Sequence, residues 1–578
     1  MRTTAVLVSA GLGLAALIFG PAPVQAGPAK TDKDRTETGR TLSGNYLAGR
    51  HAQAQRDLSA AADFLGAALK QTPDAPGLLH RTFILLTVEG RIKEAEVLAR
   101  RLIKANPKMT IAHLVLAATD IKQGRFAAAR KRLGKMPEKS IGGFAAPVLR
   151  AWSLMGMKKS KAALKLLAAE PKEKAAKVLH LMHRALINEM LGRNDLAEKH
   201  YLAVNKDQNG GSLRVVQLLG ELYERTARPE KARTLYQNYL KDKPGSQLLD
   251  VALKRLKAGR PPGLKVFSVS AGAAEAFFSI ASSLRRQNAQ EMALALGRLA
   301  LYLKPNFPVM QILMGDILEA VDRLEPALEV YSSISPTSAF SWPARLRITS
   351  LLNRLNRTDE AVGHLNRMAK DQTDDPGPLI SLGDILRGRE RFEEAVVAYD
   401  QAFKRIQTLE ERHWSLLYTR AIALERSKQW PRAEADFLSA LKFKPEQPYV
   451  LNYLGYSWID KGMYLDRAQK MIAKAASLRP NDGFIIDSLG WGYYRLGDFE
   501  KAVPELERAV ELRPQDPIIN DHLGDAYWRV GRRREAVFQW KRSLSLDPEE
   551  DVVTKIKRKL KVGLGDDTET AKKPGNDG

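Results

Sequence analysis

The chain has 578 residues, of which 44% are hydrophobic and 27% are charged. That apolar fraction can bury a core, which excludes a chain that is disordered throughout. There is no cysteine, so no disulfide can form and the lipidated cysteine of a lipoprotein is absent. The formal net charge of +25 suits an acidic partner, such as anionic lipid, lipopolysaccharide, an acidic protein or nucleic acid. Charge spread over solvated helix faces explains the same excess.

The chain begins with Arg2, an apolar run from Ala5 to Phe19, and the small residues Val24 and Ala26. This order predicts a secretory signal peptide over residues 1–26, cleaved before Gly27. An uncleaved anchor is the alternative, but the run is shorter than the roughly 20 residues of a spanning helix. We therefore expect a periplasmic protein, possible association with the envelope being left open, and no nucleic-acid partner. Cleavage removes one positive charge and changes the net charge from +25 to +24.

A polar stretch over residues 27–40 predicts a disordered spacer, and a repeat with a period of 34 residues follows it. The period is clearest at Pro480, Pro514 and Pro548, which lie 34 residues apart. The two segments between these prolines agree at seven positions: Leu489-Gly490 with Leu523-Gly524, Tyr493 with Tyr527, Gly497 with Gly531, Ala502 with Ala536, Leu506 with Trp540, and Ala509 with Ser543.

Each of these positions has a physical reason. A small residue at Gly490 or Ala502 lets two antiparallel helices approach closely, and Tyr493 and Leu506 fill the space beside them. Gly497 turns the chain, and a proline such as Pro514 prevents the second helix from continuing. One repeat is therefore predicted to be a helical hairpin that buries its apolar face against its neighbours.

A small residue recurs along the chain at the position of Ala502, which predicts fourteen hairpins: Ala61, Ala95, Ala129, Ala163, Ala197, Ala232, Ala293, Ala327, Ala361, Ala395, Ala433, Ala468, Ala502 and Ala536. The steps are 34, 34, 34, 34, 35, 61, 34, 34, 34, 38, 35, 34 and 34 residues. The step of 61 predicts a break, so we expect an N-terminal lobe over residues 41–245, an irregular connector over 246–272 and a C-terminal lobe over 273–548.

The connector contains a helix-like stretch from Gln247 to Lys257 and then a breaker from Gly259 to Gly263. The alternating residues 265–270 fit either a strand-like strap or a plain linker. Four extra residues at 407–412 predict a longer turn between repeats, and one extra residue near Leu465 or Asp466 predicts a longer hairpin. Residues 549–562 predict a capping helix, and residues 563–578 a disordered tail.

The period and its small and large positions resemble the tetratricopeptide repeat (TPR) family. The resemblance implies an all-α solenoid, a superhelix of about fourteen helical hairpins, here in two lobes. The segments 452–456, 487–491 and 521–528 also resemble exported tetratricopeptide proteins common in alphaproteobacteria, a group that implies no particular chemistry.

No catalytic or cofactor motif accompanies the repeats. GxSxG, HExxH, a Walker-type phosphate loop and CxxC are all absent, so we expect no enzyme, no cofactor and no catalytic residue. His180 and His183 share a helix face and could hold a metal, but no third ligand accompanies them, so a solvated or packed pair is the preferred interpretation and no metal site is predicted.

The first helices of such hairpins line a concave face, where repeat arrays usually bind their ligands. Residues on that face of the last hairpins are rich in aromatic and charged types, which dominate binding energy at protein interfaces. The predicted partner-binding residues are Tyr449, Asn452, Tyr456, Phe484, Asp487, Trp491, Tyr494, Arg495, Asp521, Asp525, Trp528 and Arg529. The alternative is that these aromatic residues only pack within the array.

These observations lead to two hypotheses of function. The first is a non-enzymatic scaffold that binds a peptide or helix of a partner protein along the C-terminal concave face. The second is an envelope structural or assembly factor whose basic surface contacts anionic lipid or polysaccharide. The two differ in salt dependence, because charge-driven binding weakens as ionic strength rises.

Overall fold

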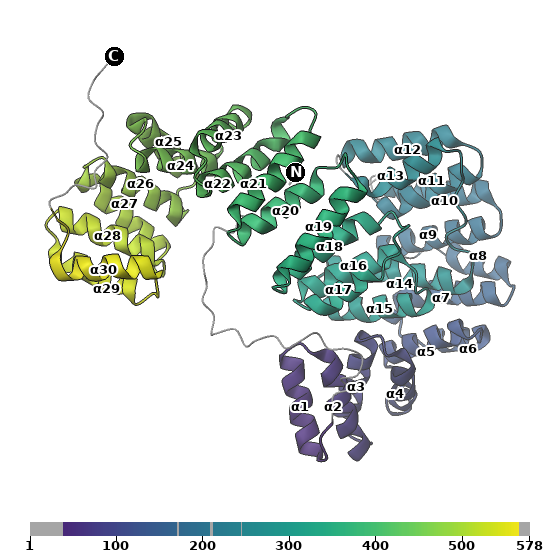
Figure 1. Ribbon diagram of the computed structural model, residues 1–578. Coiled ribbons are helices and arrows are strands. Elements are labelled where there is room, and N and C mark those ends of the chain that lie inside the picture. The colour runs from purple at the N-terminus through teal and green to yellow at the C-terminus, as the bar shows by residue number, and fades with distance from the viewer. Residues whose placement is uncertain (1–37, 170, 172, 208–211, 244–245, 566–578) are drawn as a thin grey trace. The chain divides into compact units, whose positions relative to one another are not determined.

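The computed structural model describes residues 38–565 apart from residues 170, 172, 208–211 and 244–245 (Figure 1). The predicted signal peptide, most of the predicted spacer and most of the predicted tail lie outside the described residues. Within them the chain forms thirty α-helices and two short 3-10 helices, and no strand. The all-α hairpin solenoid predicted from the sequence is confirmed. The strand-like alternative for residues 265–270 is wrong, since that segment forms no strand.

Twenty-eight of the helices pair into fourteen hairpins, the number that the alanine series predicts. The six hairpins before the connector are α1 Leu42–Ala54 with α2 Leu58–Gln71, α3 Pro76–Val88 with α4 Ile92–Ala105, α5 Thr110–Lys122 with α6 Phe126–Leu133, α7 Ile141–Gly156 with α8 Ser160–Ala168, α9 Lys174–Met190 with α10 Asn194–Asp207, and α11 Leu213–Arg225 with α12 Pro229–Asp242.

The connector contains the 3-10 helix Gln247–Leu249 and α13 Asp250–Lys257, so the predicted helix-like stretch is confirmed. Eight hairpins follow: α14 Val269–Arg286 with α15 Gln290–Leu303, α16 Pro308–Ala320 with α17 Leu324–Ser332, α18 Ser341–Arg354 with α19 Thr358–Asp371, α20 Gly377–Gly388 with α21 Phe392–Arg405, α22 Trp414–Arg426 with α23 Trp430–Phe443, α24 Pro448–Asp460 with α25 Leu465–Leu478, α26 Gly483–Arg495 with α27 Phe499–Leu512, and α28 Pro517–Arg529 with α29 Arg533–Leu544.

The periodic small residues lie where the two helices of each hairpin touch. All fourteen alanines of the series are completely buried. The first helix supplies a second close approach, since a Cβ atom added to Gly490 would stand 2.6 Å from Leu506, and one added to Gly524 would stand 2.5 Å from the Trp540 ring. The sequence period is therefore the period of the helix contacts, as close packing requires.

Each hairpin turn contains a residue with left-handed backbone at an equivalent position. Six of these fourteen residues are glycines, among them Gly497 (φ 82°) and Gly531 (φ 84°). The other eight are not glycine, for example Ala227 (φ 54°) and Glu390 (φ 59°). They adopt a backbone conformation that is sterically unfavourable for residues with a Cβ atom. The repeat fold thus imposes the turn geometry even where the sequence lacks the residue that suits it.

The two predicted insertions are present. The extra residues after α21 form an irregular turn with the 3-10 helix Glu411–His413 before α22. The extra residue of the next hairpin lies in the turn after α24, where Tyr464 adopts left-handed backbone (φ 47°) directly before α25. Both insertions fall in turns, so the helix contacts of the repeat are kept.

The structure divides into two compact units at a different place from the predicted connector. One unit comprises the described residues up to Ala361, and the other those from Val362 onward. The connector lies inside the first unit: Val266 is buried, Arg225 donates to the Gly263 carbonyl, and Lys304 donates to the Lys265 carbonyl at 3.2 Å. The break in the repeat is therefore not the boundary between compact units.

The reason is that α14 and α15 return to the first helices of the earlier hairpins. Helix α14 packs on α7 and α9, and α15 packs on α3 and α5 (Figure 1). Gly272 lies against the buried Trp152 ring, and Arg298 donates to the Val88 carbonyl at 2.9 Å. In this unit the chain's own helices therefore cover the first helices α3 to α9.

In the second unit the first helices form a row, which we call the first-helix row: α20, α22, α24, α26 and α28. Helix α20 contacts α22, α24 contacts α26, and α26 contacts α28. The last helix, α30 Glu550–Val562, follows the last hairpin and buries Ile556. A helix therefore lies where the capping helix is predicted.

Candidate functional site

The predicted partner-binding residues all lie on α24, α26 and α28 of the first-helix row. On α24, Tyr449, Asn452 and Tyr456 are half-buried. The Asn452 Oδ1 atom is buried and accepts no hydrogen bond from the described part of the chain. Burial, together with the nearby Asp487 and Asp460 carboxylates, raises the pKa of Tyr456, so it is a neutral hydroxyl. Helix α24 thus presents two aromatic rings and an amide along one side.

Helix α26 contributes a stacked aromatic group. The Trp491 ring lies parallel to the Tyr494 ring, with centroids 4.6 Å apart, and parallel to the His522 ring of α28 at 3.9 Å. The Nδ1 atom of His522 is 2.9 Å from a carboxylate oxygen of Asp487. Burial alone would lower the pKa of His522, but the carboxylates of Asp487 and its neighbours raise it above its ordinary value, which favours an imidazolium beside Asp487.

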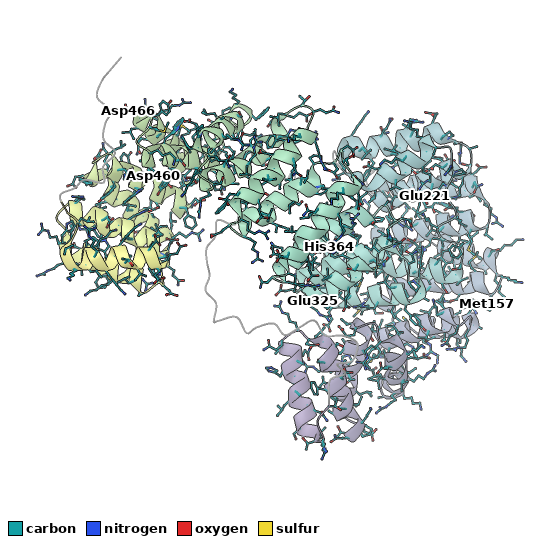
Figure 2. All side chains as sticks on the ribbon, viewed as in Figure 1. Met157, Glu221, Glu325, His364, Asp460 and Asp466 are labelled. Atoms are coloured by element: carbon teal, nitrogen blue, oxygen red, sulfur yellow. The ribbon has the colours of Figure 1, made fainter. Side chains whose placement is uncertain are left out.

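Neighbouring first helices are joined by pairs of residues 35 positions apart. Arg495 donates from Nη1 to Asp460 at 3.2 Å, and Figure 2 labels Asp460 at the end of α24. Arg529 donates from Nε to the Tyr494 hydroxyl at 3.4 Å. The Asp487–His522 pair has the same spacing. The repeat length plus one residue is therefore a recurring spacing for polar contacts between adjacent first helices.

The last hairpin binds the chain's own C-terminal helix. Lys559 of α30 donates to Asp521 at 2.8 Å and to Asp525 at 2.7 Å. Asp525 also accepts from Trp540 Nε1 at 2.8 Å. Burial raises the pKa of Asp525 to about 6, although Lys559 acts in the opposite direction. A basic side chain of a helix is thus held between two carboxylates of α28.

The chain after α30 covers the remaining two predicted residues of this hairpin. The backbone at Gly563 lies so close to the Trp528 ring that an added Cβ would stand 2.1 Å from it. Arg529 donates from Nη1 to the Gly565 carbonyl at 3.2 Å. All four predicted residues of α28 therefore contact α30 or the residues that follow it.

The twelve predicted residues differ in exposure. Five are buried: Asp487, Trp491, Tyr494, Asp521 and Asp525. Trp491 is 8% exposed and Tyr494 is 2% exposed, and both belong to one hydrophobic cluster with Leu506 and Trp540. The expectation that these two rings are open groove residues is therefore wrong. Trp491 is stacked between Tyr494 and His522, and Tyr494 is covered by Trp491 and by an edge contact with Phe499. The other seven keep partial exposure: Tyr449, Asn452, Tyr456, Phe484, Arg495, Trp528 and Arg529.

Two residues of the site, His522 and Lys559, were not predicted from the sequence. His522 pairs with Asp487, and Lys559 pairs with Asp521 and Asp525. His522 could have been found from its spacing of 35 residues from Asp487, since that spacing joins adjacent first helices. Lys559 had no such signal, because it belongs to a helix outside the repeat. Its place depends on how α30 packs on the last hairpin.

The histidine pair of the first unit is packed in the core. His183 is completely buried and accepts from Trp152 Nε1 at 2.9 Å. Burial, with a smaller effect of His180, lowers the pKa of His183 to about 3, so the ring is neutral. Among the described residues no cluster of three or more His, Asp or Glu side chains could hold a metal ion. Nor does any described helix have the length and apolar character needed to cross a bilayer.

Three segments of the chain match family models. Residues 86–140 and 380–448 match models described as "Tetratricopeptide repeat", and residues 492–531 match one described as "TPR repeat". The TPR repeat-containing protein PA4667 of Pseudomonas aeruginosa is 30% identical over 190 residues. That match covers 33% of this chain and 31% of the relative, so the chain spans about a third of the relative's length.

Two solved structures align with about nine tenths of the chain at low TM-scores. A chain of the APC/C hetero-tetramer Cut9–Hcn1 is 16% identical, with 91% of this chain and 97% of that chain covered and a TM-score of 0.37. Yeast Tom70 is 14% identical, with 90% and 96% covered and a TM-score of 0.31.

Proposed function

Since the chain is a tetratricopeptide-repeat protein, we propose that it is a non-enzymatic scaffold of the bacterial periplasm or cell envelope. In this proposal it binds a peptide or helix of a partner protein along the first-helix row of its second unit. Repeat arrays of this kind generally bind proteins through their extended concave surfaces. The first unit offers less of this surface, because α14 and α15 cover its first helices.

The contact between α28 and α30 carries this proposal. There a helix already lies against the first-helix row and places Lys559 between two carboxylates of α28. The positions one repeat earlier hold Asp487 and Trp491, and those one repeat before that hold Asn452 and Tyr456. Asp487 and Trp491 are buried. The residues that continue this surface with partial exposure are Asn452 and Tyr456 of α24 and Phe484 and Arg495 of α26. The last part of the surface is occupied by the chain itself.

Several half-buried side chains on α24 and α26 have the chemistry of a protein interface. Tyr449, Tyr456 and Phe484 present aromatic surface, and tyrosine and arginine are enriched at interface hot spots. Two buried polar atoms in this region, Asn452 Oδ1 and Arg495 Nε, have no hydrogen-bond partner among the described residues. Buried polar groups of this kind are costly when unpaired, so a partner that supplies a donor and an acceptor gains free energy there.

The partner can be identified by site-specific photo-crosslinking. The full chain would carry benzoylphenylalanine at Tyr456 on the first-helix row or, as the control, at Tyr464, which is 58% exposed in the turn after α24. Under the proposal, one protein crosslinks from position 456 in the native envelope and is absent from position 464. Equal crosslinking from both positions, or none from position 456, would contradict binding along this row.

Export can be tested separately. Mass spectrometry of the native protein should find a mature N-terminus at Gly27, because Val24 and Ala26 provide the small residues that signal cleavage requires. An intact Met1, or a start well beyond Gly27, would contradict the periplasmic proposal and leave the binding proposal standing.

A further inference from the structure

The first unit contains a cavity that lies outside the first-helix row. Its volume is about 370 Å³, which falls within the range of ligand pockets. Helices α11 and α13, the connector after α13, and the turns before α16 and α18 form its walls. Neither the repeat pattern nor the proposed function accounts for it.

The cavity carries an excess of positive charge. Four cationic side chains line it, Arg214, Arg255, Lys265 and Lys304, against one carboxylate, that of Glu221. Two of them are neutralised from behind: Arg214 by Glu275, and Arg255 by two hydrogen bonds of 2.9 and 2.7 Å to Glu224.

The two lysines form only long ion pairs with carboxylates. Lys304 Nζ is 3.9 Å from Glu275, and Lys265 Nζ is 3.6 Å from Glu221, both beyond hydrogen-bonding distance. Lys304 Nζ donates one hydrogen bond, to the Lys265 carbonyl at 3.2 Å. Burial lowers the pKa of Lys304 to about 8, and Arg214 and Lys265 add to the effect against the opposing Glu275. An anion placed between the lysines would therefore gain two partly desolvated cations.

Glu221 adds a second requirement. Its side chain is 8% exposed, and Oε2 is buried without a hydrogen-bond donor among the described residues. The nearest cations are Lys265 at 3.6 Å, Arg255 at 3.8 Å and Arg225 at 3.9 Å. Figure 2 labels Glu221 among the side chains of the first unit. A ligand that brings an N–H group to this oxygen satisfies a buried acceptor that would otherwise remain costly.

The rest of the wall is apolar and partly open. Phe267, on the connector, is 69% exposed although the preceding Val266 is buried. Val251 of α13 is 42% exposed, and Phe340 is a buried part of the same wall. A large apolar side chain placed here would remove both its own surface and the Phe267 ring from water.

We propose that this cavity binds a short acidic peptide segment of a partner protein, in which an Asp or Glu side chain stands next to a large apolar side chain. The acidic group lies between Lys265 and Lys304, the apolar side chain lies against Phe267 and Phe340, and a backbone N–H donates to Glu221. A fatty acid supplies the carboxylate and the apolar chain but no donor for Glu221, whereas a peptide supplies all three. The proposal rests on the proposed protein-binding function but uses a different unit of the chain.

The test uses a defined probe, a fluorescein-labelled capped peptide of sequence Gly-Glu-Phe-Glu-Gly, titrated with the full mature chain and followed by fluorescence anisotropy. We expect saturable binding at an ionic strength of about 0.15 M. Replacing both glutamates of the probe by glutamine should weaken binding at least about tenfold, as loss of charge-assisted hydrogen bonds does. Equal binding of the glutamine probe, or no saturable binding of the glutamate probe, would overturn the proposal.

Variants locate the binding on the protein. Phe267→Ala and Lys265→Gln alter exposed connector side chains and should each weaken the probe at least about tenfold without lowering the melting temperature. The matched controls are Phe538→Ala, at a phenylalanine that is 74% exposed on α29, and Lys474→Gln, at a lysine with 48% side-chain exposure. If the connector variants bind the probe as well as the controls do, the cavity is not its site.

Two further arms separate the remaining outcomes. Decanoate should compete only weakly with the probe, and competition by decanoate at the affinity of the peptide would overturn the peptide assignment in favour of a small anionic amphiphile. Tyr456→Ala, in the second unit, should bind the probe unchanged. If Tyr456→Ala abolishes partner binding but the chain never binds the probe, only the inference about the cavity is refuted. If the chain binds the probe but Tyr456→Ala leaves partner binding unchanged, only the function proposed for the first-helix row is refuted.

Discussion

Substitution of Lys559 by methionine tests how α30 is held on the last hairpin. The change keeps the length of the side chain and leaves the carboxylates of Asp521 and Asp525 without their shared cation. The lysine is 16% exposed, Asp521 is 12% exposed and Asp525 is 4% exposed, so this is a largely buried group. Removing one partner of a buried ion pair costs about 3–5 kcal/mol, and the residual exposure places this case near 3 kcal/mol.

The cost should depend on pH. Asp525 already has its pKa raised to about 6 with the lysine present, and loss of the lysine raises it further. The buried carboxylate destabilises the folded variant only while it is ionised. Lowering the pH toward 6 protonates Asp525 in the variant and therefore reduces the loss of free energy of unfolding. We therefore expect the difference in free energy of unfolding between parent and variant to be larger at pH 8 than at pH 6.

Urea unfolding followed by tryptophan fluorescence measures this difference, since Trp528 and Trp540 lie beside α30. Lys555→Met is the matched control, because Lys555 stands one turn earlier on the same helix, is 70% exposed, and should change stability by less than about 0.5 kcal/mol. If Lys559→Met is no more destabilising than Lys555→Met, or if its defect is the same at both pH values, the buried contact described above is incorrect.

Three other predictions concern the repeat itself. Residues 390 and 531 both have left-handed backbone, which glycine adopts without the steric penalty of a side chain. Glu390→Gly should therefore stabilise the chain by about 1 kcal/mol, and Gly531→Ala should destabilise it by a similar amount. Thermal melts should show shifts of the melting temperature of opposite sign. Trp491→Ala should cost about 3–5 kcal/mol in urea unfolding because the ring is buried, whereas the exposed Phe538→Ala should cost less than about 0.5 kcal/mol, and equal effects would place Trp491 outside the core. The raised pKa of His522 implies a stabilising contribution that is complete below pH 6.5 and is lost as the pH rises through the raised value. His522→Gln should therefore destabilise the chain most at low pH. A loss of stability that does not depend on pH would argue against an imidazolium at His522.

The fold could be predicted from the sequence because each hairpin repeats the same local requirement. A completely buried alanine, a close helix approach and one turn per repeat recur at nearly fixed spacing, so the number of fourteen hairpins follows from the sequence alone. The longer turn before α22 was predicted for the same reason. An insertion shifts the phase of the pattern without altering it.

Contacts between distant repeats could not be predicted in this way. The packing of α14 and α15 on α3, α5, α7 and α9 depends on small rotations accumulated over several repeats, which the period does not encode. The prolines of the connector predict the end of a helix, but they do not predict whether the next helix packs on the earlier hairpins or extends away from them. For that reason the predicted boundary at residues 246–272 and the boundary of the compact units at Ala361 differ.

The candidate site was predicted in part. Its helices and its aromatic character followed from the repeat positions, and seven of the twelve residues keep partial exposure. The burial of Trp491 was not foreseen, because its ring is stacked between Tyr494 of the same helix and His522 of α28. The second contact depends on how the side chains of two adjacent first helices pack. The contacts of Asp521 and Asp525 were not foreseen either, since their partner Lys559 lies outside the repeat.

The central claim, that a partner protein binds along α24 and α26, is tested most directly by titrating the crosslinked and then purified partner with two tyrosine variants. Tyr456→Ala should weaken the affinity by at least about thirtyfold, equivalent to a hot-spot loss of about 2 kcal/mol, at both low and physiological ionic strength. Tyr464→Ala, at the exposed tyrosine of the following turn, should remain within about twofold of the parent. Equal affinity of the two variants, with binding that disappears as salt is raised, would contradict the account and favour a charge-driven contact of the basic surface.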